Sequence, residues 1–168
     1  MNKLAERYGR AVEEPYVIPY FNGKVADDSG VTSMALLEEG GHVAMHSFDR
    51  KGIIFLDLAC SNPEVLEERD KIKDFIAGVF QTGRHDIFTR HSGGIETLPV
   101  CFGPHYMADG RVTERPNMEA VYDFLDSLPE AIGMTPISKP QVIKRNDGGM
   151  TGAVIIAESH IAWQFKPI

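Results

Sequence analysis

The 168-residue sequence is poor in cysteine, with Cys60 and Cys101 as its only two. The two cysteines have no CxxC spacing, and no histidine stands at the distance that zinc ligands keep in sequence. The local pattern therefore predicts no metal site. Two thiols in a chain of this size are more often reduced than bridged, so we expect no disulfide.

The sequence also lacks an excess of basic residues and any long apolar run. Its 17 Lys and Arg against 24 Asp and Glu give a formal net charge of −7. Nucleic acids and anionic membranes require clustered basic side chains, so neither is expected as a partner, whereas a cationic small molecule fits the charge better. No apolar stretch approaches 18 residues and no basic-then-apolar segment opens the chain, which predicts a cytoplasmic protein without a membrane span or signal peptide.

What the sequence does contain is typical of an ordinary globular protein, with 43% hydrophobic and 24% charged residues. Its first third breaks into short extended segments divided by turn formers, which predicts an antiparallel meander. The predicted strands cover residues 15–24, 31–38, 42–48 and 53–59. An amphipathic helix is predicted next over 61–80, with Asn62 as its cap and Pro63 in its first turn.

The rest of the chain repeats this alternation of strands and a helix. Two strands, 85–90 and 104–109, flank a predicted linker over 93–103. A helix over 117–128 would place Met118, Val121, Tyr122 and Leu125 on one face. Three strands are expected after it, over 135–145, 152–158 and 161–165. This order predicts an α+β fold of antiparallel sheets with helices on one face, built as one compact unit from two halves, 1–92 and 104–168.

An internal repeat is the strongest signal in the sequence. Residues 28–32 precede an apolar run and then Glu39-Gly40-Gly41-His42, and residues 147–151 precede an apolar run and then Glu158-Ser159-His160. The earlier copy has one extra residue at its turn. Similar turn chemistry could produce two unrelated hairpins of this kind, but the shared acid, histidine and following alanine favour a duplication.

Ser159 is the reactive residue in this repeat. A serine at a tight turn can attack the preceding carbonyl, here that of Glu158, which replaces the amide by an ester. Elimination leaves dehydroalanine, which hydrolyses to a pyruvoyl group. That ketone condenses with a substrate amine and accepts the electrons left by decarboxylation, so it serves as a cofactor made from the chain itself.

Within GGMTGAVIIAESHIA, residues 148–162, the Glu-Ser-His motif resembles that of the bacterial and archaeal type of S-adenosylmethionine decarboxylase. These proenzymes carry Gly-Val-Thr/Ser, an apolar run and Glu-Ser-His, and cleave before the serine. The resemblance covers most of the chain in a rearranged order, since 103–168 resembles the first half of a family member and 30–92 a later part. It implies an αββα-like sandwich, a pyruvoyl group from Ser159, an amino-acid-type substrate and a role in spermidine synthesis.

Each copy departs from the family pattern at a different position. Gln164 stands where the family has its second histidine, which the earlier copy keeps as His46, while Gly40-Gly41 replaces the serine of the earlier copy. We therefore expect one composite site. The resemblance implies catalytic roles for Ser159, Glu158, His46, Cys60 and His160, and processing support from Thr32 and Thr151. The family's catalytic cysteine aligns only approximately, with Ser61 in strict register and Cys60 one residue earlier.

Other functions remain open at this level. A pyruvoyl group requires only that the substrate has an amine next to a carboxylate, so ornithine and arginine are alternative substrates. A non-catalytic relative that binds a partner or a small effector is a third reading, because neither copy is complete. A truncated coding sequence would give the same pattern, and a homodimer is compatible with all of these readings.

Overall fold

The computed structural model describes residues 3, 5–6, 9–13, 16–20, 29–48, 50–60, 68–80, 94–97, 104–108, 110–157 and 159–167. The chain forms two compact units. One consists of Met1–Asn62 together with Pro116–Ile168, and the other of Pro63–Arg115. This division differs from the predicted halves 1–92 and 104–168, which follow the sequence repeat. The first unit holds every described residue of the candidate site.

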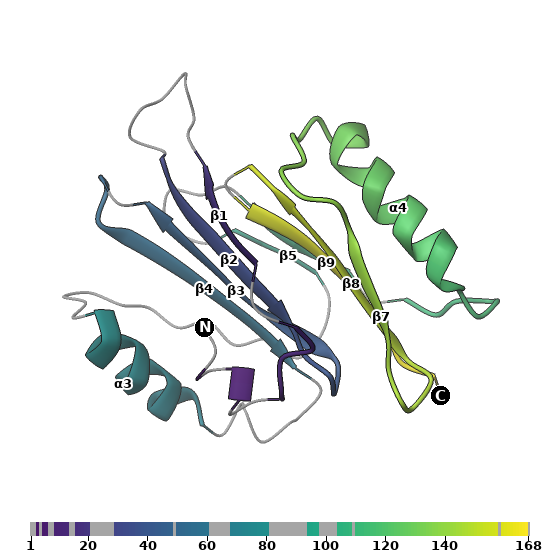
Figure 1. The fold of residues 1–168 in the computed structure, drawn as a ribbon, viewed down its shortest axis with the longest axis horizontal. Coiled ribbons are helices and arrows are strands. Elements are labelled where there is room, and N and C mark those ends of the chain that lie inside the picture. The colour runs from purple at the N-terminus through teal and green to yellow at the C-terminus, as the bar shows by residue number, and fades with distance from the viewer. Residues whose placement is uncertain are drawn as a thin grey trace. The chain divides into compact units, whose positions relative to one another are not determined.

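The first sheet of this unit is the predicted antiparallel meander. Its strands, in the order in which they pair, are β1 (Tyr16–Tyr20), β2 (Gly30–Leu36), β3 (Gly41–Phe48) and β4 (Ile53–Cys60) (Figure 1). Each strand pairs antiparallel with its neighbour along the chain. Residues 37–40 join β2 to β3 directly, as a short connection between antiparallel strands can. The turn before β4 uses Gly52 at a positive φ of 62°.

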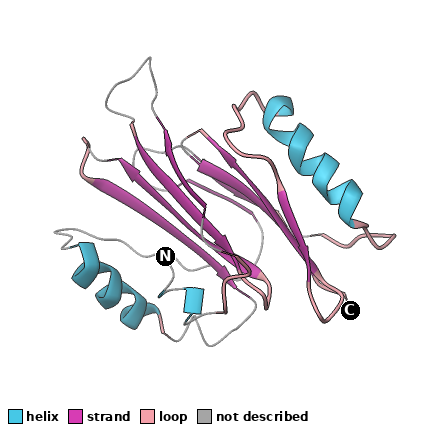
Figure 2. Cartoon of the chain, in the orientation of Figure 1, coloured by secondary structure: helices cyan, strands magenta, loops and turns pink. Residues whose placement is uncertain are grey.

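The second sheet is also antiparallel and carries a helix on one face. It contains β7 (Gln141–Lys144), β8 (Met150–Ile156) and β9 (Ser159–Phe165), paired in that order. Helix α4 (Met118–Ala131) lies along this sheet (Figures 1 and 2). The helix begins at Asn117, whose side chain accepts a hydrogen bond from the amide of Ala120 at 2.8 Å.

The predicted apolar face of α4 is correct for two of its four residues. Val121 and Leu125 are buried and form a core with Met150 and Val154. Met118 and Tyr122 are 43% and 37% exposed, so the true face is narrower than the prediction. A helix covering a three-stranded sheet buries only one stripe of residues.

The opposite face of the second sheet contacts the first sheet. Met34, Leu36 and Ala44 of the first sheet form one buried cluster with Ala153 and Ile155 of the second. Strand side chains alternate between two faces, so β8 contributes to both this cluster and the core beneath α4. The predicted α+β class with antiparallel sheets is confirmed.

The second unit contains α3 (Arg69–Phe80), β5 (Gly94–Thr97) and β6 (Pro104–Met107), with β5 and β6 antiparallel. The predicted helix start at 61–67 and the predicted strand 85–90 lie outside the described residues. Strand β5 falls inside the predicted linker 93–103, so that prediction missed a strand. Four residues give little periodic signal, and β5 is defined by its pairing with β6. Among the helices of the described residues, none has the length and apolarity to cross a bilayer.

Candidate functional site

The two hairpins of the repeat have the same register. In β2–β3, Thr32 is paired with His46, and in β8–β9, Thr151 is paired with Gln164. The threonines start equivalent strands and their partners lie opposite them. Gln164 therefore occupies, in the later hairpin, the register position that His46 has in the earlier one.

The same register makes His42 and His160 equivalent. His42 lies opposite Leu36, and His160 lies opposite Ile155. The turn is one residue longer in the earlier copy, as the sequence shows, and this insertion leaves the pairing of the strands unchanged. Because these faces of the two sheets contact each other, the two equivalent histidines meet.

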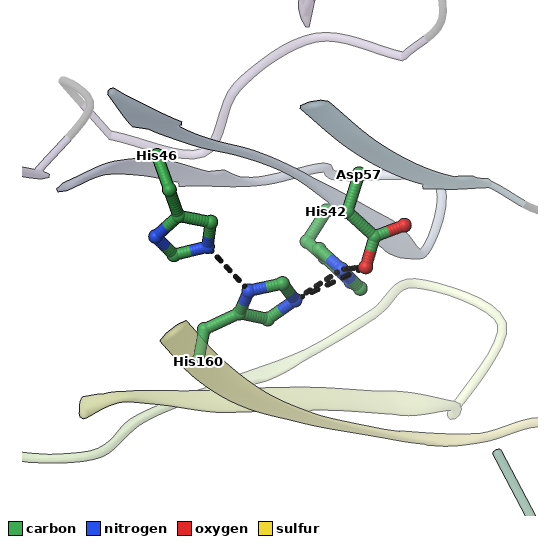
Figure 3. A network of polar contacts seen from close by, with 4 residues as sticks. All are labelled: His42, His46, Asp57 and His160. Carbon is green, nitrogen blue, oxygen red and sulfur yellow. Dashed lines mark hydrogen bonds and ion pairs between the residues drawn. The ribbon is translucent and has the colours of Figure 1, made fainter. Parts of the chain in front are cut away.

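Three side chains from three strands form a compact polar cluster (Figure 3). His160 Nε2 of β9 lies 3.1 Å from His42 Nε2 of β3 and 3.1 Å from Asp57 Oδ2 of β4. His42 Nε2 lies 3.2 Å from the same Asp57 oxygen. These three atoms therefore form an almost regular triangle between the sheets.

His46 extends this cluster on the other side of the His160 ring. Its Nε2 lies 3.0 Å from His160 Nδ1, and its Nδ1 lies 3.0 Å from Thr32 Oγ1. The two imidazole rings are stacked, with centroids 5.3 Å apart and planes 9° from parallel. Thr32 and His46 are both buried. A continuous chain of polar contacts thus runs from Thr32 through His46 and His160 to Asp57.

The charges of the cluster follow from burial and hydrogen bonding. Burial would raise the pKa of Asp57, but hydrogen bonds from His160 and His42 outweigh it and hold this pKa well below its ordinary value. Burial, together with the neighbouring His160, lowers the pKa of His46 to about 4. At neutral pH, Asp57 is therefore ionised and His46 neutral.

One proton arrangement satisfies this chain of contacts. The Thr32 hydroxyl donates to His46 Nδ1, and His46 Nε2–H donates to His160 Nδ1. His160 Nε2–H then donates to the Asp57 carboxylate. Each neutral imidazole has one donor and one acceptor, so the same contacts also admit the reverse direction between Thr32 and His160, with His160 Nε2 accepting from His42 Nε2–H. The chain thus links the buried Thr32 hydroxyl to the Asp57 carboxylate through two imidazole rings.

Ser159 lies beside this cluster but its side chain is on the other face of β9. It is the first residue of the strand, half-buried and paired with Ile156. Ile161 and Trp163 lie two and four residues further along the strand, so their side chains are on the same face as that of Ser159, and they pack beneath α4. The His160 side chain is on the opposite face of β9, where it contacts His46. Glu158, the other residue of the predicted cleavage bond, lies outside the described residues.

Cys60 is not brought to the cluster. It ends β4 opposite Gly41, and it lies three residues after Asp57, so alternation places its side chain on the opposite face of the sheet. Its thiol is half-buried and is not part of a disulfide. Ser61, the alternative alignment of the family's cysteine, lies outside the described residues.

Gly41 occupies the position of Ser159 in the earlier copy, directly before the equivalent histidine. Its φ is +124°, and a Cβ placed there would lie 2.0 Å from the carbonyl oxygen of Ala59. The backbone of β4 therefore excludes any side chain at this position. This close approach explains physically why the earlier copy has no serine before His42.

Thr32 and Thr151, the two threonines predicted to support processing, differ in their hydrogen bonds. Thr32 Oγ1 contacts His46, whereas Thr151 Oγ1 is buried and, within the described part of the chain, has no hydrogen-bond partner. Gln164, which stands opposite Thr151, is exposed. With Gln164 rather than a histidine opposite it, the buried Thr151 hydroxyl is unsatisfied within the described part of the chain.

Valine substitutions at the two threonines are expected to have opposite outcomes. Thr32→Val removes a hydroxyl that pairs with a buried imidazole and should lower the free energy of unfolding by about 1 to 3 kcal/mol. Thr151→Val replaces an unpaired hydroxyl by a methyl group and should leave stability unchanged or raise it by about 1 kcal/mol. Urea unfolding of both variants measures this, and equal losses would contradict the difference between the copies.

His42 and Asp57 are the site residues that the sequence analysis missed. The repeat carried a signal for the first, since His42 occupies the position of His160. The sequence signal for Asp57 was weaker: it is a single acidic residue inside the apolar run IIFLDLAC. An acid in such a strand requires a partner when it is buried.

The cluster of Thr32, His42, His46, Asp57 and His160 is therefore the candidate site of the chain. Comparisons with models of protein families, with curated proteins and with solved structures find no match.

Proposed function

We propose that the chain is a pyruvoyl-dependent decarboxylase of the S-adenosylmethionine decarboxylase type, cleaved between Glu158 and Ser159 and active in spermidine synthesis in the cytoplasm. The observation that carries this proposal is the 3.0 Å contact between His46 Nε2 and His160 Nδ1. It joins the copy that keeps the second histidine to the copy that keeps the serine. In the proposed fold, the two facing sheets form an αββα-like sandwich with α4 as an outer layer.

The position of Ser159 is compatible with the formation of a pyruvoyl group. Ser159 is half-buried at the start of β9, next to a turn, and its hydroxyl is covalently close to the Glu158 carbonyl that it would attack. Attack of its hydroxyl on the Glu158 carbonyl moves a proton to the Ser159 nitrogen and forms an ester. Removal of the α-proton then releases the Glu158 carboxylate, and hydrolysis releases ammonia. The pyruvoyl group would supply an electron sink for decarboxylation.

The polar cluster is proposed to handle the protons of these steps. His160 follows Ser159 in the chain, and both of its ring nitrogens have partners, His46 on one side and Asp57 on the other. Proton transfer between Ser159 and the cluster would pass through His160, whose Nε2 lies against the ionised Asp57 carboxylate. The neutral His46 fixes the orientation of the His160 ring and is itself oriented by Thr32.

Cleavage at Ser159 is the direct test. Denaturing mass spectrometry is expected to show a chain of residues 1–158 and a pyruvoyl-capped peptide that begins at position 159. Ser159→Ala should abolish cleavage, whereas Ser127→Ala, on the exposed side of α4, should cleave normally. Processed protein should then release carbon dioxide from carboxyl-labelled S-adenosylmethionine. Release from ornithine or arginine alone would keep the chemistry and overturn the substrate.

A non-catalytic relative that binds a partner or an effector is the second candidate function. The observation that favours it is the alternation along β9, which directs the Ser159 side chain away from His46. A single uncleaved species of correct mass after long incubation, with the fold intact by circular dichroism, would select this function over the first.

A further inference from the structure

The triangle formed by His42, Asp57 and His160 has the dimensions of a metal site. Its three sides measure 3.1, 3.1 and 3.2 Å between the two Nε2 atoms and Asp57 Oδ2. Four ligands around a tetrahedral Zn²⁺, with bonds of about 2.0 to 2.1 Å, stand about 3.3 Å apart. The observed triangle is therefore close to one face of such a tetrahedron, and a small expansion would accommodate an ion.

Proton counting gives a second reason. If both Nε2 atoms carry protons for Asp57, two N–H groups 3.1 Å apart share one carboxylate oxygen and repel each other. If only one Nε2 carries a proton, the lone pair of the other faces that N–H at 3.1 Å and also the anionic oxygen of Asp57. A divalent cation in the triangle would satisfy all three lone pairs at once, because neutral imidazoles and an ionised carboxylate are metal ligands.

The surroundings of His160 match those of metal-bound histidines. Such histidines usually donate their second ring N–H to a neighbouring acceptor, which fixes the ring and its tautomer. His160 Nδ1 lies 3.0 Å from His46 Nε2, and His46 Nδ1 lies 3.0 Å from Thr32 Oγ1. With Nε2 of His160 bound to metal, the protons of this chain reverse direction, so that His160 donates to His46 and His46 donates to Thr32.

The site also has limited access to solvent. The side chains of His42 and His160 are 6% and 8% exposed, whereas that of Asp57 is 32% exposed. The carboxylate side therefore offers a route for the ion and room for a fourth, non-protein ligand. Three protein ligands with one open position are typical of catalytic rather than structural zinc sites.

We propose that His42, Asp57 and His160 bind one divalent transition-metal ion, such as Zn²⁺, through Nε2, Oδ2 and Nε2, with a water molecule as the fourth ligand. The absence of a zinc pattern in the sequence does not conflict with this site. Its ligands come from β3, β4 and β9, so they meet only after the two sheets pack together. The proposal uses the His160 ring and not Ser159, so metal binding can be measured separately from cleavage; an ion on His160 Nε2 would take the place of the proton that lies there against Asp57.

Cobalt binding to the purified full-length chain tests the proposal. After dialysis against chelator, addition of Co²⁺ should give the visible absorption of tetrahedral Co²⁺, saturating at one ion per chain and displaced by Zn²⁺. His42→Gln, Asp57→Asn and His160→Gln should each weaken binding by more than about 100-fold. His46→Gln should weaken it by about 10- to 100-fold, since His46 orients a ligand without binding the ion.

Control variants separate this site from other causes of lost binding. Asp126→Asn removes an exposed carboxylate that pairs with Lys139 on another face of the unit and should bind Co²⁺ as the wild type does. Ser159→Ala should also bind normally, so failure of cleavage and failure of metal binding are distinguishable. Circular dichroism in chelator shows which ligand variants fold, and three variants are available. Saturation below one ion per chain, or folded ligand variants that bind like the wild type, would overturn the proposal.

Discussion

Gly41→Ala is expected to lower the free energy of unfolding by about 3 kcal/mol or more, a large part of the stability of a typical domain. The new Cβ would lie 2.0 Å from the Ala59 carbonyl oxygen, at a backbone φ of +124°. Both the short contact and the positive φ are unfavourable for a side chain. The contact is with backbone atoms of Ala59, which cannot rotate away as a side chain could. Relief would require β3 and β4 to separate where Gly41 pairs with Cys60.

Gly52→Ala is the matched control for this prediction. Gly52 also has a positive φ, +62°, but a Cβ there would meet nothing within 4 Å. Its substitution should cost only about 1 to 2 kcal/mol of conformational strain. Urea unfolding of both variants gives the comparison, and a Gly41 loss no greater than that of Gly52 would remove the steric explanation for the missing serine.

In metal-free protein kept in chelator, lowering the pH from 6.5 to 4 is expected to cost about 3 kcal/mol of unfolding free energy through His46. Burial and the neighbouring His160 lower the pKa of His46 from 6.5 to about 4, with Asp57 opposing and His42 adding to the shift. The unfolded chain therefore binds a proton in a range where the folded protein does not. The contribution of His46 is complete above pH 6.5 and is lost as the pH falls through 4.

His46→Gln tests the origin of this pH dependence. Glutamine keeps a polar side chain but does not titrate, so the unfolding free energy of the variant should change much less between pH 6.5 and 4. Asp57 will add a further loss at lower pH, because its depressed pKa stabilises the folded state only while the carboxylate is ionised. Urea unfolding at several pH values measures both effects, and superimposable pH curves for wild type and His46→Gln would contradict the prediction.

The fold was largely predictable because its signals are local. The strands of both sheets have apolar runs bounded by glycine and polar turns, and α4 has a clear start at Asn117. Strand β5, over Gly94–Thr97, was missed, since a four-residue strand depends on its partner rather than on its own sequence. The exposure of Met118 likewise depends on how much of α4 the sheet covers.

The candidate site was predictable only in part. The repeat and the family resemblance selected His46 and His160, which the structure brings into contact. They did not select Asp57, because nothing in its local sequence indicates that it meets two histidines. Cys60 was selected by approximate alignment, and alternation along β4 separates it from the cluster. A shift of one residue in a strand changes the face of the sheet, so an alignment uncertain by one residue cannot assign a side chain to a site.

The 114 residues that separate His46 from His160 set the order in which the site can form during folding. Each hairpin brings together residues close in sequence and can form within microseconds, whereas docking of the two sheets requires closure of a long loop. The strands can therefore exist before the cluster does. Contacts between residues far apart in sequence are associated with slower folding, so we expect the His46–His160 contact to form after the hairpins. A chain in which the two sheets have not packed together could have the backbone pairing of both hairpins, but it would lack the cluster of His42, His46, Asp57 and His160.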